Sequence, residues 1–195
     1  MAGGNVNIVH RQNRPSRRFL MTCRLRDIIP ARYLLEVRVS RQIMRLFERL
    51  PEGLAASRED FAWQRDFLIS TSRYGVGQRV GSEKTPLGLH RIAEKIGAGY
   101  PVGTSFSARQ AVGYTWAGHP GAPIAHRILR LDGLEPGFNR GGKVDTHARY
   151  IYIHGVGDEV TLGRPASIGC IYLAAHDLMP LFDRLTSGDL VWIET

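Results

Sequence analysis

The alternation of apolar and polar side chains predicts a protein built mainly from short strands. Apolar and polar residues alternate at 35–40, which is typical of a half-buried strand. Residues 42–47 have the composition of its hairpin partner, although this run also fits a short helix. Turn-forming residues separate the later runs, and 97–118 is predicted to be mostly loop. The later runs that predict strands are 61–70, 89–96, 124–131, 150–153 and 190–193.

One helix is predicted late in the chain, after Cys170. Asp177 is expected to be its N-terminal cap, so that Pro180 falls in the first turn, where proline is tolerated. Short strands around a single helix predict a mainly β fold, either a sandwich or a barrel-like sheet. The apolar residues that share one face of this helix are Leu178, Leu181, Phe182 and Leu185.

The length and charge of the chain limit its organisation and partners. Its 195 residues suit one domain, which we place at 31–195, preceded by a basic and poorly ordered tail at 1–30. The net charge of +8 favours anionic partners. A nucleic-acid partner is not expected, because no stripe of basic residues alternates with stacking aromatics. No transmembrane segment is expected either, because no apolar run approaches about 18 residues.

The N-terminal region contains two weak resemblances to export signals. Residues 16–20 resemble a twin-arginine signal and 20–23 resemble a lipoprotein cleavage box, but charged residues from Arg24 onward interrupt the apolar core that both need. No signal peptide is therefore predicted, and a misassigned start codon stays open. The two cysteines, Cys23 and Cys170, are not expected to form a disulfide framework or a metal site.

The strongest chemical pattern pairs His154 with Cys170. The strand-like run at 150–153 places His154 at its end, and a loop containing glycine and proline leads to Cys170. A thiolate is a strong nucleophile, and a nearby imidazole is the usual means of generating one. If His154 activates Cys170, the pKa of the thiol is expected to lie below its ordinary value of about 8.5.

Each of these residue types also has an ordinary structural use. A single cysteine is more often a core residue than a nucleophile, and a single histidine on a strand is more often a hydrogen-bonded packing residue. Asp158 and Glu159 are interpreted as a solvated loop pair and not as an acid–base dyad. Packing or surface roles are assigned to the remaining histidines considered, which are His90, His119, His126, His147 and His176.

Five sequence blocks, in order, carry a resemblance to a known family. They are Ile-Ser-Thr-Ser at 69–72, Thr-Pro-Leu-Gly at 85–88, Ile-Ala-Glu-Lys-Ile-Gly at 92–97, Leu-Asp-Gly-Leu at 131–134, and Tyr-Ile-His-Gly at 152–155 with Ser-Ile-Gly-Cys-Ile at 167–171. With these blocks the chain resembles the L,D-transpeptidase catalytic domain, or YkuD domain, of bacterial cell-wall enzymes. The resemblance covers about 34–193 and favours the nucleophile and base over the packing roles.

The resemblance implies a reaction and a set of site residues. Such enzymes cut a peptidoglycan tetrapeptide stem after its third residue, hold the acyl group on cysteine, release D-alanine and pass the acyl group to an amine. It implies Cys170 as nucleophile and His154 as general base, with Gly155 and Ser167 shaping the site and the N–H groups of Gly169 and Cys170 as oxyanion donors. It also implies stem-peptide partners, a periplasmic or envelope location, and no metal or organic cofactor.

Two positions depart from the family pattern Ser-His-Gly-Cys-Ile-Arg. Ile168 replaces the second histidine and Tyr172 replaces the arginine, so an imidazole and a guanidinium fork are both missing. Two hypotheses therefore stay open. One is an active cysteine acyltransferase, and the other is a catalytically weakened homologue that binds cell-wall peptide without turning it over.

Overall fold

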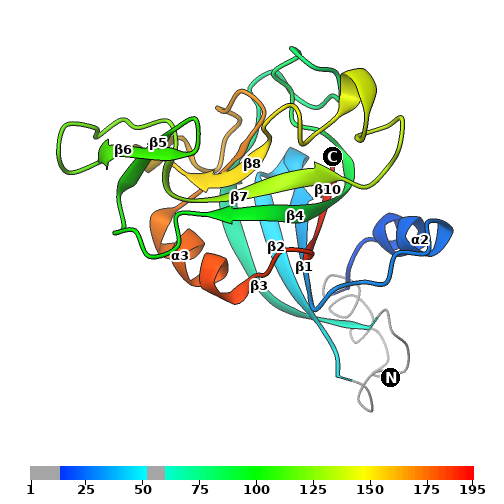
Figure 1. The fold of residues 1–195 in the computed structure, drawn as a ribbon. Helices are drawn as coiled ribbons and strands as arrows, with labels where there is room; N and C mark the ends of the chain where they lie inside the picture. Colours follow the sequence, from blue (N-terminus) through cyan, green and yellow to red (C-terminus); the bar gives the residue numbers. More distant parts are fainter. Residues whose placement is uncertain (1–13, 52–59) are drawn as a thin grey trace, which may run out of the picture.

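The computed structural model describes residues 14–51 and 60–195. Within these residues, ten strands form one sheet in the order β4-β10-β1-β2-β3-β9-β8-β7-β5-β6 (Figure 1). Three short 3-10 helices lie at Val39–Arg41, Gly142–Val144 and Glu159–Thr161. The other elements are α2 (Arg17–Leu25), β1 (Tyr33–Arg38), β2 (Ile43–Arg49), β3 (Phe61–Ser70), β4 (Gly88–Ile96), β5 (Thr104–Ser107), β6 (Gln110–Tyr114), β7 (Ala125–Gly133), β8 (Tyr152–Gly155), β9 (Ile171–Leu173), α3 (Ala175–Arg184) and β10 (Leu190–Glu194).

The sheet closes on itself. Strand β4, at one end of the order, also pairs with β7, so the strands from β4 through β7 form a barrel of eight. The β5–β6 hairpin extends from β7 and projects from the side of the barrel (Figure 1). The β1–β10 and β8–β9 pairs are parallel and the others are antiparallel. The predicted mainly β, barrel-like fold is therefore confirmed.

The main core combines the inner face of the barrel with α3. Leu35 and Val37 of β1 belong to this core, and the apolar face of α3 contributes Leu178 and Phe182. These four side chains are almost completely buried. Because the helix supplies apolar side chains to the same core as the strands, the segment that follows the Cys170 loop is fixed in position.

Helix α2 corrects the prediction of a poorly ordered tail up to residue 30. Strand β1 is buried on both faces: Leu35 points into the barrel, whereas Leu34 belongs to a second cluster that includes Phe19 and Cys23 of α2. The Phe19 ring packs edge-on against Phe61 with 6.0 Å between centroids. Helix α2 lies beside the barrel (Figure 1) and covers the apolar outer face of β1. The first thirteen residues of the predicted tail lie outside the described residues.

Two further expectations differ from the structure. The segment predicted to be mostly loop contains strands β5 and β6, which are too short to give a clear alternating pattern. Helix α3 begins at Ala175 and its cap position is Ala174, so Asp177 lies inside the first turn and Pro180 in the second. Asp177 forms an ion pair with Arg65 at 2.6 Å instead of capping the helix.

The hairpin interpretation of residues 42–47 is correct, since this segment lies in β2 and pairs with β1 in antiparallel register. No helix among the described residues is long and apolar enough to cross a membrane.

Candidate active site

The parallel pairing of β8 with β9 places His154 and Cys170 on neighbouring segments of the sheet. The register aligns Ile153 with Ile171 and His154 with Tyr172. Aligned residues of neighbouring strands face the same side of a sheet, and side chains alternate along each strand. Cys170 lies two positions before Tyr172, so its side chain shares a face with that of His154. In this register Cys170 immediately precedes β9 and lies next to Tyr152 at the start of β8, whereas His154 lies two residues further along the same face of the strand pair.

The His154 imidazole is neutral and oriented. Its side chain is 2% exposed, and Nδ1 lies 2.8 Å from the Gly155 carbonyl oxygen. A carbonyl oxygen only accepts hydrogen bonds, so Nδ1 carries the proton and Nε2 presents a lone pair. Burial lowers the pKa of His154 to about 4, against the opposing effect of the Gly155 hydrogen bond. Near neutral pH the ring can accept a proton at Nε2.

The Cys170 thiol has a backbone acceptor and a raised pKa. Its Sγ donates a hydrogen bond to the Tyr150 carbonyl oxygen at 3.6 Å. Burial raises the pKa of Cys170 to about 11, although the Tyr152 backbone N–H and the charge of Arg149 act in the opposite direction. The expectation of a thiol pKa below 8.5 is therefore wrong for this state, because desolvation outweighs the groups that favour the thiolate.

The resting pair is thus a neutral thiol and a neutral imidazole. In the described part of the chain the thiol has the Tyr150 carbonyl oxygen as its acceptor, not His154. Hydrogen bonds of catalytic groups often tighten only once substrate is bound. The arrangement suits general-base catalysis, in which the proton leaves sulfur as the new bond forms, rather than a preformed thiolate–imidazolium pair.

Hydrogen bonds from Ser167 and Thr85 hold the loop that carries Cys170. The Ser167 hydroxyl donates to the Cys170 carbonyl at 2.6 Å and accepts the Gly169 N–H at 3.2 Å. The Thr85 hydroxyl donates to the Gly169 carbonyl at 3.1 Å. Gly169 has φ of 127°, a conformation that favours glycine. The hydrogen bond of Thr85 to this loop was not predicted from the sequence.

Gly155 is required by the space around it. A Cβ at this position would lie 2.4 Å from His126 Cδ2 and 2.8 Å from the Ala125 carbonyl oxygen. Because the Gly155 carbonyl also fixes the His154 ring, a larger residue here would disturb the proposed base directly. This agrees with the site-shaping role that the resemblance implies.

The two altered positions have different surroundings. Ile168 is 55% exposed and presents apolar surface on the loop before Cys170. Tyr172 is half-buried, and its ring centroid lies 5.0 Å from that of His154. Burial and the Cys170 thiolate both raise the pKa of Tyr172, whereas the charge of Arg73 lowers it. Tyr172 therefore packs against the imidazole and cannot supply the charge of an arginine.

Several residues around the thiol were not predicted from the sequence. Tyr150 has φ of 56°, which is unusual for a residue with a side chain, and its carbonyl accepts the thiol hydrogen bond. Arg149 donates to the carbonyl oxygens of Gly77 and Gln78 and so holds a neighbouring loop. A strained backbone leaves no signature in composition, which is why the sequence did not identify Tyr150.

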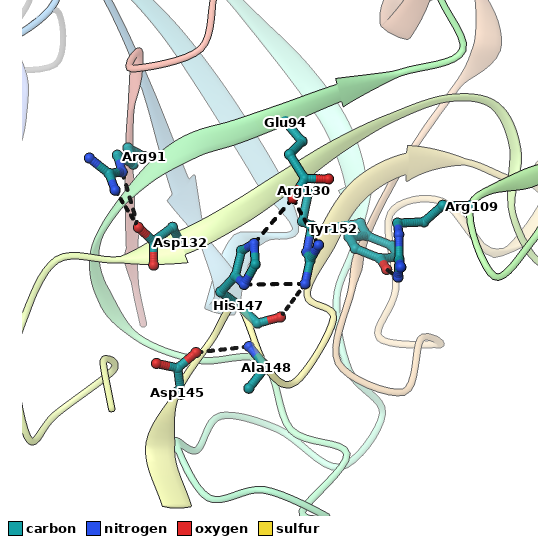
Figure 2. A network of polar contacts seen from close by, with 9 residues as sticks. All are labelled: Arg91, Glu94, Arg109, Arg130, Asp132, Asp145, His147, Ala148 and Tyr152. Atoms are coloured by element: carbon teal, nitrogen blue, oxygen red, sulfur yellow. Dashed lines mark hydrogen bonds and ion pairs between the residues drawn. The ribbon is translucent and has the colours of Figure 1, made fainter. Parts of the chain in front are cut away.

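A polar network adjoins this segment (Figure 2). Glu94 pairs with Arg130 at 2.8 Å and with His147 Nε2 at 3.2 Å. Arg109 donates to the Tyr152 hydroxyl at 3.4 Å, and Figure 2 shows its side chain beside that ring. His90 is completely buried between the Gly88 carbonyl and Thr146, in agreement with the packing role expected for it.

Comparison of the sequence with known families gives a match to the YkuD L,D-transpeptidase catalytic domain over residues 54–193. The matched region covers most of the chain, and it contains both His154 and Cys170. The chain therefore belongs to the L,D-transpeptidase catalytic domain family. A search of curated protein sequences gave no match.

Solved structures with a similar fold include Bdellovibrio bacteriovorus Bd1075, with a TM-score of 0.54, 16% identity, and coverage of 84% of this chain and 48% of that one. The helical cell shape determining protein Pgp2 from Campylobacter jejuni has a TM-score of 0.51, 16% identity, and coverage of 85% and 47%. L,D-transpeptidase 3 from Mycobacterium tuberculosis has a TM-score of 0.47, 17% identity, and coverage of 84% and 61%. This chain thus spans about half the length of the first two.

Proposed function

We propose that this protein is a peptidoglycan L,D-transpeptidase that forms a thioacyl-enzyme on Cys170 from a stem tetrapeptide. The observation that carries the proposal is the placement of Cys170 and His154 on one face of the β8–β9 pair, with Nδ1 of His154 held by Gly155 and Nε2 free to accept a proton. Membership of the family supports the reaction class and an envelope location.

The proposed reaction has two half-reactions. His154 Nε2 takes the thiol proton as Cys170 Sγ bonds to the carbonyl carbon of the third stem residue. The C–N bond then breaks, and the imidazolium returns the proton to the departing D-alanine amine. In the second half, His154 removes a proton from the acceptor amine, which attacks the thioester and releases the thiol.

The tetrahedral intermediate needs hydrogen-bond donors for its oxyanion. The resemblance names the N–H groups of Gly169 and Cys170 for this role. Because the Gly169 N–H already donates to Ser167 Oγ at 3.2 Å, we assign the larger part to the Cys170 N–H. Removing one such donor typically costs two to three orders of magnitude in kcat.

A second candidate function is a weakened homologue that binds cell-wall peptide. The observation in its favour is the thiol pKa of about 11, together with Tyr172 in place of a cationic residue. A catalytic group works best with a pKa near the operating pH, and both Cys170 and His154 are shifted away from neutrality.

Release of D-alanine from a synthetic tetrapeptide stem separates the two candidates. An active enzyme releases D-alanine and forms a cross-linked product when an amine acceptor is supplied. A binding homologue shows saturable binding of the stem without release. The Cys170→Ser variant serves as a control, because it retains the shape of the site while removing the thiol.

A further inference from the structure

The tip of the β5–β6 hairpin is strained at Arg109. Ser107 pairs with Gln110, so the turn consists of Ala108 and Arg109 alone. Their φ values are 46° and 68°. Two-residue turns of this kind normally use Asn, Asp or Gly, because a side chain disfavours positive φ. Strain of this kind persists where the surrounding structure over-determines it, and it is found often at ligand-binding sites.

The strained turn directs the Arg109 guanidinium to the segment that contacts the thiol. Its Cζ lies 5.3 Å from the centroid of the Tyr150 ring, and Nη1 donates to the Tyr152 hydroxyl at 3.4 Å (Figure 2). The same two tyrosines contact Cys170 through their backbones, since the Tyr150 carbonyl accepts from Sγ and the Tyr152 N–H favours the thiolate. Arg109 therefore lies beside the residues that bracket the sulfur atom.

The charge of Arg109 is not neutralised within the described residues. Arg130 lies 5.2 Å from the same Tyr150 ring, but its charge is paired with Glu94. Arg109 is half-buried and has no carboxylate within ion-pair distance in the part of the chain that the structure describes. Arg149, the cation whose charge acts on Cys170, donates to backbone carbonyls of a neighbouring loop. A guanidinium fork thus remains available for an anionic ligand.

We propose that Arg109, set against Tyr150 and Tyr152, binds a carboxylate of the acyl donor and determines the preference for anionic stems. The inference rests on the proposed function for the identity of the donor. A planar fork binds carboxylates in two parallel hydrogen bonds, and stacking on a tyrosine ring limits its orientations. This cation comes from a different strand pair than position 172, where the family has its arginine and this chain has Tyr172.

Arg73 is the competing cation. Its backbone N–H donates to the Ser167 carbonyl at 3.0 Å, and its charge acts on Tyr172. Its guanidinium, however, lies 6.0 Å from the ring of its own neighbour, Tyr74. No contact of Arg73 with Tyr150 or Tyr152 is present, whereas Arg109 contacts both. We therefore assign carboxylate binding to Arg109, and an Arg73→Gln variant tests the alternative.

Steady-state kinetics with matched donors test the assignment. Arg109→Gln is expected to lower kcat/KM for a carboxylate-bearing tetrapeptide about tenfold, and Arg109→Lys is expected to recover part of this loss. Arg184→Gln is the matched control, because Arg184, at the end of α3, also places its guanidinium over a tyrosine ring, that of Tyr33 in β1. Its kcat/KM is expected to equal that of the natural protein.

Two amidated donors identify the carboxylate. If Arg109 binds the terminal carboxylate of the leaving residue, Arg109→Gln no longer lowers kcat/KM for a donor that is amidated at that carboxylate. If Arg109 binds a side-chain carboxylate of the third residue, the same holds instead for the donor amidated at that position. The proposal would be overturned if Arg109→Gln changed kcat/KM equally for all donors. It would also be overturned if Arg73→Gln lowered kcat/KM tenfold and Arg109→Gln did not.

Alkylation of Cys170 tests the cationic site without any stem peptide. Iodoacetate and iodoacetamide react by the same chemistry but differ in charge, so the ratio of their rates cancels changes in thiolate population. Arg109→Gln is expected to lower the iodoacetate-to-iodoacetamide ratio at least threefold at low salt, with Arg184→Gln unchanged. An unchanged ratio would overturn the cationic site. If no donor releases D-alanine but the ratio falls, the proposed function fails while the anion-binding site stands.

Discussion

The Cys170 thiol donates its hydrogen bond to the Tyr150 carbonyl oxygen, with 3.6 Å between Sγ and that oxygen. This contact turns the proton of the proposed nucleophile toward the backbone. The acceptor belongs to a residue with an unusual φ of 56°. If Cys170 is the nucleophile, we expect a bound substrate to displace the thiol from this acceptor.

The first prediction concerns the pH dependence of thiol reactivity. Because burial raises the pKa of Cys170 to about 11, the rate of alkylation by iodoacetamide is expected to rise between pH 7 and 10, by about tenfold per pH unit in His154→Ala, where only the free thiolate reacts, and less steeply in the natural protein. His154→Ala is expected to slow the reaction near neutral pH and to approach the natural rate at high pH, where the base is no longer needed. Site-resolved mass spectrometry measures both profiles.

A plateau of the natural profile below pH 9 would contradict the raised thiol pKa. Superimposable profiles for the natural protein and His154→Ala would show that His154 is structural.

The second prediction concerns stability in acid. The pKa of His154 is about 4 in the folded protein and about 6.5 when unfolded. The unfolded chain therefore binds the proton first as pH falls, and the contribution of His154 is complete above pH 6.5 and lost progressively toward pH 4. Between pH 7.5 and 4.5 the natural protein is expected to lose about 2–3 kcal/mol more unfolding free energy than His154→Gln.

Urea denaturation at the two pH values measures this difference. Other titrating groups contribute equally to the stability change in both proteins and cancel in the comparison. They include His90, whose burial also lowers its pKa to about 4. Equal losses in the two proteins would show that the His154 ring is solvated.

The third prediction concerns helix α2. Phe19 is fully buried against Phe61 and Trp192, so Phe19→Ala is expected to lower the free energy of unfolding by about 3–5 kcal/mol. Met21, on the same helix, is 63% exposed, and Met21→Ala is expected to change it by less than about 0.5 kcal/mol. Equal effects of the two substitutions in urea denaturation would mean that α2 does not cover the barrel.

The fourth prediction concerns the two positions that depart from the family. Ile168 is exposed, so Ile168→His is expected to fold normally, and Tyr172→Arg restores a guanidinium near the thiol. The double variant is expected to acylate faster than the natural protein, by about tenfold for each 1.36 kcal/mol of transition-state interaction gained. Single-turnover acylation measures the rates, and circular dichroism checks the fold. A folded double variant that is no faster would show that these positions do not limit acylation.

The alternating pattern was sufficient to predict most strands and the mainly β class. It failed where side chains are buried on both faces or strands are very short. Leu34 and Leu35 are adjacent, yet one packs under α2 and the other inside the barrel. Helix α2 was missed because its basic composition resembles that of a tail, whereas its stability comes from two buried residues, Phe19 and Cys23.

The sequence motifs were sufficient to predict the candidate nucleophile and base, but not the residues that surround them. The motif predicts that His154 acts on Cys170, and the parallel register of β8 with β9 places the two residues on neighbouring segments of the sheet. The raised thiol pKa was not predictable, because desolvation depends on the residues that surround the sulfur in three dimensions. Arg109 was also missed, since the Ala-Arg turn that presents it lacks the usual turn residues.

The central claim is that Cys170 is the acylated nucleophile, and intact-mass analysis tests it most directly. After incubation with a carbapenem, a class that generally acylates the cysteine of this family, the natural protein is expected to gain the mass of one drug molecule. Cys23→Ala should retain this adduct, because Cys23, in α2, is only 2% exposed, and Cys170→Ala should lose it. An adduct that persists in folded Cys170→Ala, or its absence from the natural protein at every pH up to 10, would contradict the account.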